Sequence, residues 1–429
     1  MKVRYIYSAC IEVSNDDLTL LTDPWFTEGI YDGSWYHFPR IQDPLDILEE
    51  PDVIYISHIH PDHYDSTFLK QLFARYGEKP VIIPDFENNF LALKTKTDGI
   101  TALPTTEMQI GNTDIAIFPN LSGSVSDIDS AVLVSDGTNA VLNLNDCEWN
   151  DAHVDAIHAY MSRKSISLDL LASGFTGAGP YPQTYFDPIS ERDALIAEAE
   201  GKKQRFFARY QKYCEAFPAR YNLPFAGKYL LGGKLAGLNE FRGVADPVEI
   251  LKIDPKAIVL ADGGAGTIDL AADVVGETRD EPYSEADRQS RINEIKNLPL
   301  DYEREIQIPF EKINFARLVR AAYGKAIVKS EVATDYYFIL NVQAPENRAN
   351  SFILNANKEA PEISSWETGI YPDADYSELF IDYRYAFGLL TGLYHWNNAE
   401  VGSQITTRRR PGTNFHRPAQ AFLNFMATC

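Results

Sequence analysis

The sequence is poor in cysteine, with four among 429 residues, at Cys10, Cys147, Cys214 and Cys429. These cysteines are widely separated, and none belongs to a Cys-x-x-Cys pair. Disulfide scaffolds and zinc knuckles use closely spaced cysteines, so both classes are excluded. We therefore expect reduced thiols and a cytoplasmic protein.

Long apolar runs and positive charge are also scarce. No run approaches the roughly 20 apolar residues that a membrane-spanning helix needs, and residues 1–6 are charged and strand-like, unlike a signal peptide. The chain has 39 Lys and Arg against 61 Asp and Glu, a net charge of -22. Nucleic acids and anionic membranes attract basic surfaces, so we expect neither as a partner. A small-molecule substrate remains compatible, and the sequence leaves the oligomeric state open.

The chain exceeds one ordinary domain in length, and its patterns divide it into three parts. Residues 1–275 begin with strands and continue with strands that alternate with helices, which is typical of an α/β sandwich. Residues 276–305 are acidic and polar, and we interpret them as a linker. Residues 306–429 mix strands with a final helix, and they predict a smaller C-terminal α+β domain.

Alternation and apolar spacing predict the individual elements. Strands are expected at residues 4–13, 18–22, 53–57, 81–84, 115–118, 131–135, 140–144, 257–260, 335–342 and 379–383. Helical spacing is expected over residues 66–76, 187–217 and 418–426. The pair Asp136-Gly137 predicts a hairpin between two of the strands.

A cluster of metal-binding residue types follows the predicted strand at residues 53–57. It reads His58-Ile59-His60-Pro61-Asp62-His63. His58 and His60 project from the same side of an extended chain, so they can hold one ion together. Asp62 and His63 follow in the loop and can reach a second ion. Imidazole and carboxylate together suit zinc, iron or manganese.

A set of surface-loop histidines is the alternative interpretation of this run. The sequence has eight histidines, and three of them fall within these six residues, beside an aspartate and directly after a strand. That concentration favours a metal site. A pair of such ions would polarise an electrophile, generate hydroxide near neutral pH, or bind dioxygen if the metal is iron.

The His-x-His-x-Asp-His run after a hydrophobic strand resembles the signature of the metallo-β-lactamase superfamily. The resemblance implies a four-layer αββα sandwich with the metals at one edge of its two sheets. It also implies an aspartate that ends a later strand and bridges the two metals. Asp146, which follows Val141-Leu142-Asn143-Leu144-Asn145, matches that position, and a turn-forming aspartate is the alternative there.

Four further blocks resemble the CMP-N-acetylneuraminate hydroxylase branch of this superfamily. In chain order they lie at residues 145–147 (Asn-Asp-Cys), 174–182 (Gly-Phe-Thr-Gly-Ala-Gly-Pro-Tyr-Pro), 224–227 (Pro-Phe-Ala-Gly) and 395–402 (His-Trp-Asn-Asn-Ala-Glu-Val-Gly). Together they extend the likeness over most of the chain. The known enzyme of the branch inserts oxygen into the N-acetyl group of a sugar nucleotide, with electrons from a Rieske iron–sulfur centre.

The sequence departs from the family pattern in its electron donor and in one ligand of the first metal. It has no Cys-x-His ligand pair for a Rieske centre, so an oxygenase would need a separate electron donor or an electron-rich substrate. The family's third histidine for the first metal is expected between Phe118 and Ser130, where the sequence has none. Asp127 and Asp129 are the substitutes, and Asp129 is preferred because it leads directly into the next strand.

The family's last histidine, for the second metal, is also missing. Ala226 occupies that region and cannot coordinate an ion. Asp262 ends another predicted strand, but a turn with Gly263-Gly264 is the better interpretation there. The remaining ligand set is richer in carboxylate than a hydrolytic di-zinc site, which favours iron.

Three functions compete. The favoured one is a non-haem diiron oxygenase that acts on a small molecule or a sugar-nucleotide-like substrate. A dinuclear zinc hydrolase of an ester, amide or phosphodiester, with Asp62 orienting the water, is the first alternative, and a non-catalytic metal-binding scaffold is the second. The expected cofactor is two metal ions, with iron favoured and zinc or manganese as alternatives. The predicted metal ligands are His58, His60, Asp62, His63, Asp129 and Asp146.

His153, shortly after Asp146, is a further candidate for general acid or base catalysis beside Asp62. A structural histidine is the alternative for it.

Overall fold

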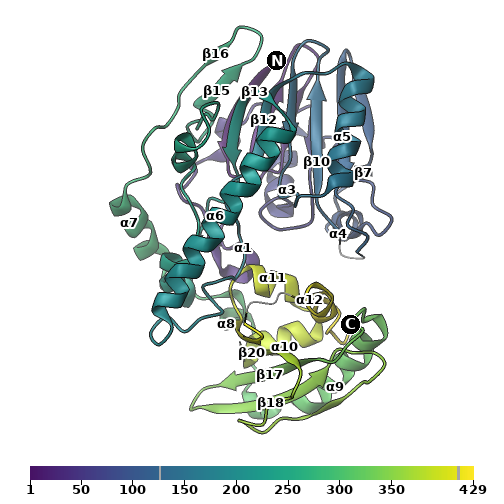
Figure 1. Ribbon diagram of the computed structural model, residues 1–429, viewed down its shortest axis with the longest axis vertical. Helices are drawn as coiled ribbons and strands as arrows, with labels where there is room; N and C mark the ends of the chain where they lie inside the picture. The colour runs from purple at the N-terminus through teal and green to yellow at the C-terminus, as the bar shows by residue number, and fades with distance from the viewer. Residues whose placement is uncertain (125–126, 413–415) are drawn as a thin grey trace.

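The computed structural model describes residues 1–124, 127–412 and 416–429. The first part of the chain folds into two mixed sheets that pack face to face (Figure 1). The eight-stranded sheet has the order β16 (Val274–Val275), β15 (Gly266–Asp269), β1 (Lys2–Tyr7), β2 (Cys10–Ser14), β3 (Thr19–Thr22), β5 (Val53–Tyr55), β6 (Val81–Ile83), β7 (Ala102–Pro104). The six-stranded sheet has the order β13 (Ala219–Phe225), β12 (Leu168–Gly174), β11 (Ala140–Asn143), β10 (Ser130–Ser135), β9 (Thr113–Pro119), β8 (Glu107–Ile110).

Helices cover the outer faces of both sheets. The first pair, α3 (Ser66–Tyr76) and α4 (Phe90–Thr97), packs on the eight-stranded sheet. The second pair, α5 (Asp151–Lys164) and α6 (Arg192–Ala216), covers the six-stranded sheet. Apolar side chains of the two inner faces form the core between the sheets. The predicted αββα metallo-β-lactamase sandwich is therefore confirmed.

The C-terminal part of the chain carries its own sheet, as predicted (Figure 1). Its strand order is β19 (Ile363–Ser365), β18 (Arg348–Asn355), β17 (Tyr336–Ala344), β20 (Asp375–Asp382), β21 (Thr406–Arg410). Its helices are α9 (Phe315–Ala326), α10 (Tyr383–Thr391), α11 (Trp396–Val401) and α12 (Arg417–Asn424).

Short elements complete the chain. They are the paired strands β4 (Trp35–Tyr36) and β14 (Leu230–Leu231), the helices α1 (Ile30–Gly33), α2 (Pro44–Ile47), α7 (Glu285–Ile295) and α8 (Asp301–Glu305), and the 3-10 turns at Gly233–Phe241, Pro247–Lys252, Phe310–Lys312 and Ile327–Lys329. None of the helices in the described parts of the chain is long and apolar enough to cross a bilayer.

Two strand predictions were wrong. The expected strand at residues 4–13 is a hairpin of β1 and β2, because the chain reverses at Ser8, whose φ of 50° lies in the left-handed region. The expected strand at residues 257–260 makes only isolated bridges, from Ala257 to Asn222 and from Leu260 to Thr278. Its apolar residues are buried without a continuous ladder. By contrast, the helix at residues 66–76 and the Asp136-Gly137 hairpin are confirmed.

Residues 276–305 contain two packed helices, α7 and α8, in place of an extended linker. Ile295 and Leu300 are buried, and Arg291 forms an ion pair with Glu28 of the loop after β3. The apolar side chains between the charges give these helices a packed face. The division of the chain at residues 275 and 305 stays a prediction.

The sandwich and the C-terminal part share one apolar core. Trp25 and Trp35 of the loop after β3 belong to the same cluster as Tyr385 and Trp396 from the C-terminal helices. Helices α1 and α11 lie against each other at this junction (Figure 1). The C-terminal part is thus held next to the strand ends that carry the histidine run.

Candidate metal centre

Two neighbouring parallel strands deliver the polar residues of the centre. Strands β3 and β5 run side by side, and their carboxyl ends lead into Asp23 and Ser57 respectively. The histidine run follows Ser57 in the loop before α3. The Asp65 carboxylate caps that helix by accepting the Phe68 backbone N–H, which fixes where the loop ends.

The first group of converging atoms comes from His58, His60 and Asp129. His58 Nε2 lies 2.9 Å from His60 Nδ1 and 3.8 Å from Asp129 Oδ1. Two nitrogens that bind one ion at about 2.1 Å lie roughly 3 Å apart when their bond angle is near 90–110°. The His58–His60 pair therefore has the spacing of two ligands to one ion, and Asp129 lies beside it.

The second group comes from Asp62, His63 and Asp146. His63 Nε2 lies 3.6 Å from Asp62 Oδ2 and 3.6 Å from Asp146 Oδ2. One donor atom each from His58, His63 and Asp146 also falls within 4.8 Å of the others. The two groups are therefore adjacent, with Asp146 close to both.

The outward-facing nitrogen of each histidine has a hydrogen-bond partner. His63 Nδ1 lies 2.8 Å from Asp23 Oδ2, and His60 Nε2 lies 2.9 Å from Asn397 Oδ1. His58 Nδ1 lies 2.9 Å from Ser57 Oγ, whose own proton goes to Asp23. The Asp23 carboxylate, the Asn397 amide oxygen and the Ser57 hydroxyl oxygen all act as acceptors, so the outer nitrogen of each histidine carries the proton.

It follows that His58 Nε2, His60 Nδ1 and His63 Nε2 present lone pairs toward one another. Two lone pairs 2.9 Å apart repel unless a cation lies between or beside them. Outer partners that fix the tautomer in this way are a regular feature of metal-binding histidines. The residues present therefore fit a metal.

The charges of the centre point the same way. Burial and the nearby Asp146 carboxylate raise the pKa of Asp129 to about 7. Burial alone would lower the pKa of His63, but the charges of Asp62, Asp146 and Asp23 raise it well above its usual value. The same proximity to His63 lowers the pKa of Asp146 against the effect of its burial. Carboxylates crowded around one imidazole make a site that favours additional positive charge.

The residues of the centre differ in exposure. The side chains of His58 and His63 are 0% and 1% exposed, whereas that of Asp146 is 37% exposed.

Several candidate residues lie elsewhere. His153 sits on α5 and its Nε2 lies 3.0 Å from the Phe118 carbonyl oxygen, which is a structural hydrogen bond that gives no support to an acid or base role. Asp127 accepts backbone N–H groups of its own loop, from Ser122 to Ser124. Asp262 pairs with the Lys228 ammonium 2.8 Å away.

Three residues of the centre were missed by the sequence interpretation. Asp23 ends a strand, as Asp146 does, and the parallel pairing of β3 with β5 was the available signal for it. Tyr31 donates to Asp62 Oδ1 over 2.5 Å, and Asn397 reaches His60 from the C-terminal part. Asn397 lies in the block at residues 395–402 that resembles the hydroxylase branch, but neither it nor Tyr31 was assigned to the centre, because their contacts depend on the packing of the whole chain.

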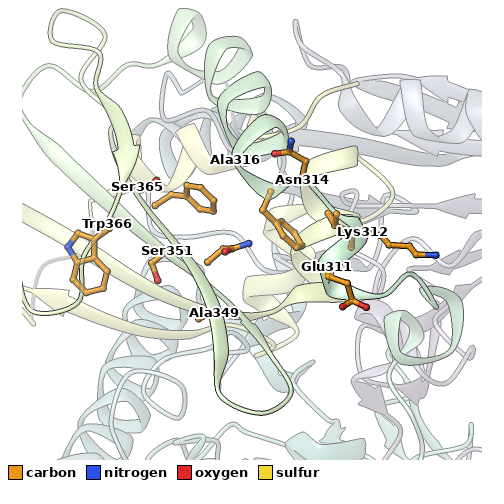
Figure 2. Close-up of a pocket in the computed structure, with 12 residues that line it drawn as sticks. Glu311, Lys312, Asn314, Ala316, Ala349, Ser351, Ser365 and Trp366 are labelled. Atoms are coloured by element: carbon orange, nitrogen blue, oxygen red, sulfur yellow. The ribbon is translucent and has the colours of Figure 1, made fainter.

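Two open hollows lie away from this centre. The first, of about 560 Å³, lies at the start of α9, and Figure 2 shows Ser351 and Trp366 on one side of it and Glu311 and Lys312 on the other. The second, of about 720 Å³, lies between the first turns of α6 and strand β21. None of the predicted ligands is among the described residues that line either hollow.

Comparison with known proteins places the sandwich in a family. Residues 2–159 match the model of the β-lactamase superfamily domain. The cytidine monophosphate-N-acetylneuraminic acid hydroxylase of Asterias rubens is 26% identical over 240 residues, which are 54% of this chain and 35% of that protein. A protein of Mycolicibacterium smegmatis, with the proposed assignment of Rieske 2Fe-2S iron–sulfur protein, is 29% identical over 267 residues, 58% of this chain and 48% of that protein. The chain thus spans about half or less of the length of these relatives.

Solved structures show more distant likenesses. The diiron β-hydroxylase CmlA of Streptomyces venezuelae has a TM-score of 0.38 and 18% identity, with 57% of this chain and 47% of that chain covered. An isothiocyanate hydrolase from Delia radicum gut bacteria has a TM-score of 0.41 and 16% identity, with 63% of this chain and 98% of that chain covered. Residues 2–159 thus match a β-lactamase superfamily domain, and the chain is distantly similar to the cytidine monophosphate-N-acetylneuraminic acid hydroxylases.

Proposed function

We propose that the chain is a dinuclear metalloenzyme and that its metals are iron. His58, His60 and Asp129 would hold one ion, and Asp62, His63 and Asp146 the other. The observation that best supports this proposal is the position of Asp129: its Oδ1 lies 3.8 Å from His58 Nε2, where the family has a histidine. Two histidines and one carboxylate are the donor set of non-haem iron oxygenases.

Iron in this set would supply dioxygen chemistry. The proposed reaction is hydroxylation of a C–H bond: one atom of O₂ enters the product as hydroxyl, and the other leaves as water with two electrons and two protons. None of the four cysteines is followed by histidine two residues later, so the electrons would come from a donor other than a Rieske centre within residues 1–429. The hydroxylase relatives support a small sugar-nucleotide-like substrate, and CMP-N-acetylneuraminic acid is the first to test.

The protein's own residues hold the donor atoms in place and limit access of water. The Tyr31 hydroxyl donates to Asp62 Oδ1, which leaves Oδ2 directed toward His63. Asp23 keeps the His63 proton on Nδ1, away from the centre. Burial of the histidines excludes water from one side, and the partly exposed Asp146 leaves the other side open to substrate.

Replacing Asp129 with histidine tests the preference for iron. The variant D129H restores a third imidazole in the first group, so we expect it to favour zinc over iron. Its oxygen-dependent rate should fall at least about 10-fold, because the carboxylate's charge-assisted interaction with the metal is lost. The measurement is competitive loading with Fe²⁺ and Zn²⁺, followed by oxygen consumption with reductant and CMP-N-acetylneuraminic acid.

The matched control is D127H, in which the same change is made two residues away, in a side chain that accepts backbone N–H groups of its own loop. It should keep the wild-type preference. Equal iron-to-zinc preference in D129H and wild type would refute the assignment of Asp129. A wild-type protein that binds zinc and hydrolyses an ester, amide or phosphodiester would replace the oxygenase by the hydrolase, and one that binds metal without turnover would indicate a scaffold.

A further inference from the structure

Asn397 reaches the centre from the far end of the chain. Its side-chain oxygen lies 2.9 Å from His60 Nε2, across 337 positions of sequence. This residue lies in the first turn of α11, within the C-terminal part. One predicted ligand of the first ion is thus hydrogen-bonded by a residue outside the sandwich.

The position of Asn397 is fixed by packing on both sides of it. The Trp396 side chain is buried in the C-terminal core, and its Nε1 donates to the Met426 carbonyl oxygen over 2.7 Å. Ala399, on the next turn, is fully buried. The Asn397 backbone N–H donates to His395 Nδ1 over 3.3 Å, which caps the helix. Movement of the Asn397 backbone would therefore require movement of the C-terminal helices.

The same segment also supports the second group of ligands. Gln404 Nε2 donates to the Tyr31 carbonyl oxygen over 2.6 Å, and Tyr31 in turn donates to Asp62. Tyr31 has a φ of 52°, a conformation that a bulky residue adopts only when its surroundings hold it there. Gly402 lies so close that a Cβ there would meet Ser34 Oγ at 2.9 Å and Tyr31 Cβ at 3.2 Å. The C-terminal segment from α11 to Gln404 is thus packed against both halves of the centre.

We propose that Asn397 is a positioning residue for His60, so that the affinity of the first metal ion depends on the docked C-terminal part. The amide oxygen accepts the Nε2 proton and thereby directs the Nδ1 lone pair toward His58. Without that acceptor, His60 loses both its orientation and its fixed tautomer. This inference rests on the proposed metal site, and it adds the C-terminal part as a component of that site.

The test is the metal affinity of full-length variants, measured by anaerobic titration with Co²⁺, whose visible absorption reports each ligand set. N397A should bind one of two ions roughly 10- to 100-fold more weakly than wild type. N397D should bind that ion as tightly as wild type or more tightly, because a carboxylate can only accept the His60 proton. N398A, in which the neighbouring asparagine of the same helix is changed, is the matched control and should behave as wild type.

The outcomes separate the inference from the proposed function. A wild-type chain that binds no Co²⁺ overturns the metal site itself. Two ions bound with unchanged affinity in N397A overturn only the role of Asn397. If N397A melts at a much lower temperature than wild type, the test rests on N397D. Weaker Co²⁺ binding by N397D, at a wild-type melting temperature, would show that the Asn397 amide donates to His60, contrary to the proposal.

Discussion

The double variant H58A/H60A is expected to bind one metal ion fewer per chain than the wild-type protein and to lose the proposed oxygen-dependent activity. It removes two of the three donors assigned to the first ion, and the remaining Asp129 carboxylate cannot retain that ion alone. The second group, with His63 and Asp146, keeps its donors. The measurement is metal content per chain after reconstitution with Fe²⁺ and removal of loosely bound metal.

A matched histidine control separates loss of ligands from loss of fold. The imidazole of His158 is exposed on α5, and its Nε2 hydrogen-bonds the Ala216 carbonyl oxygen, far from the centre in sequence. The variant H158A should therefore keep the wild-type metal content. If H58A/H60A retained as much metal as H158A, with both proteins folded by circular dichroism, the assignment of the first ion would be wrong.

The variant D23N should bind the second ion roughly 10- to 100-fold more weakly, even though Asp23 is not a predicted ligand. Asp23 Oδ1 accepts the Ser57 backbone N–H, while Oδ2 accepts the protons of Ser57 Oγ and His63 Nδ1. An asparagine that keeps its oxygen on the Ser57 N–H turns its NH₂ toward His63. His63 Nδ1 must then accept, and its proton moves to Nε2, the nitrogen that should bind metal.

The measurement for D23N is again a Co²⁺ titration, combined with thermal unfolding of the chelator-treated protein. Asp23 is fully buried, so some loss of stability is expected, on the order of 1–3 kcal/mol for a strained buried hydrogen bond. The tautomer effect is distinguished because it weakens metal binding in protein that is still folded. Wild-type Co²⁺ affinity in folded D23N would contradict the role given to Asp23.

The histidine run could be found from sequence because its signal is local. A buried strand, two histidines spaced for an extended chain, and the following Asp62 and His63 stand together in one segment. Asp146 needed the family resemblance as well, and it lies in the turn that follows β11. Asp129 was preferred over Asp127 because it leads directly into the next strand. In the structure Asp129 lies near His58, and Asp127 accepts hydrogen bonds within its own loop.

The supporting residues could not be found in this way. The contact of Asn397 with His60 depends on how the C-terminal helices dock, and the contact of Tyr31 with Asp62 depends on a left-handed backbone turn. Residues 276–305 were interpreted as a linker from their charge, and the structure has two helices there, with Ile295 and Leu300 buried. Charged residues on one helix face say little about the opposite face, and that face decides packing.

The central claim is that the three histidines of the run and their carboxylate partners hold two metal ions, and metal content tests it most directly. Full-length wild-type protein, prepared without chelator and reconstituted anaerobically with Fe²⁺, should retain about two equivalents of iron per chain after desalting, because the donor groups are already positioned for both ions. Less than about half an equivalent of iron, zinc or manganese in folded protein would contradict the account.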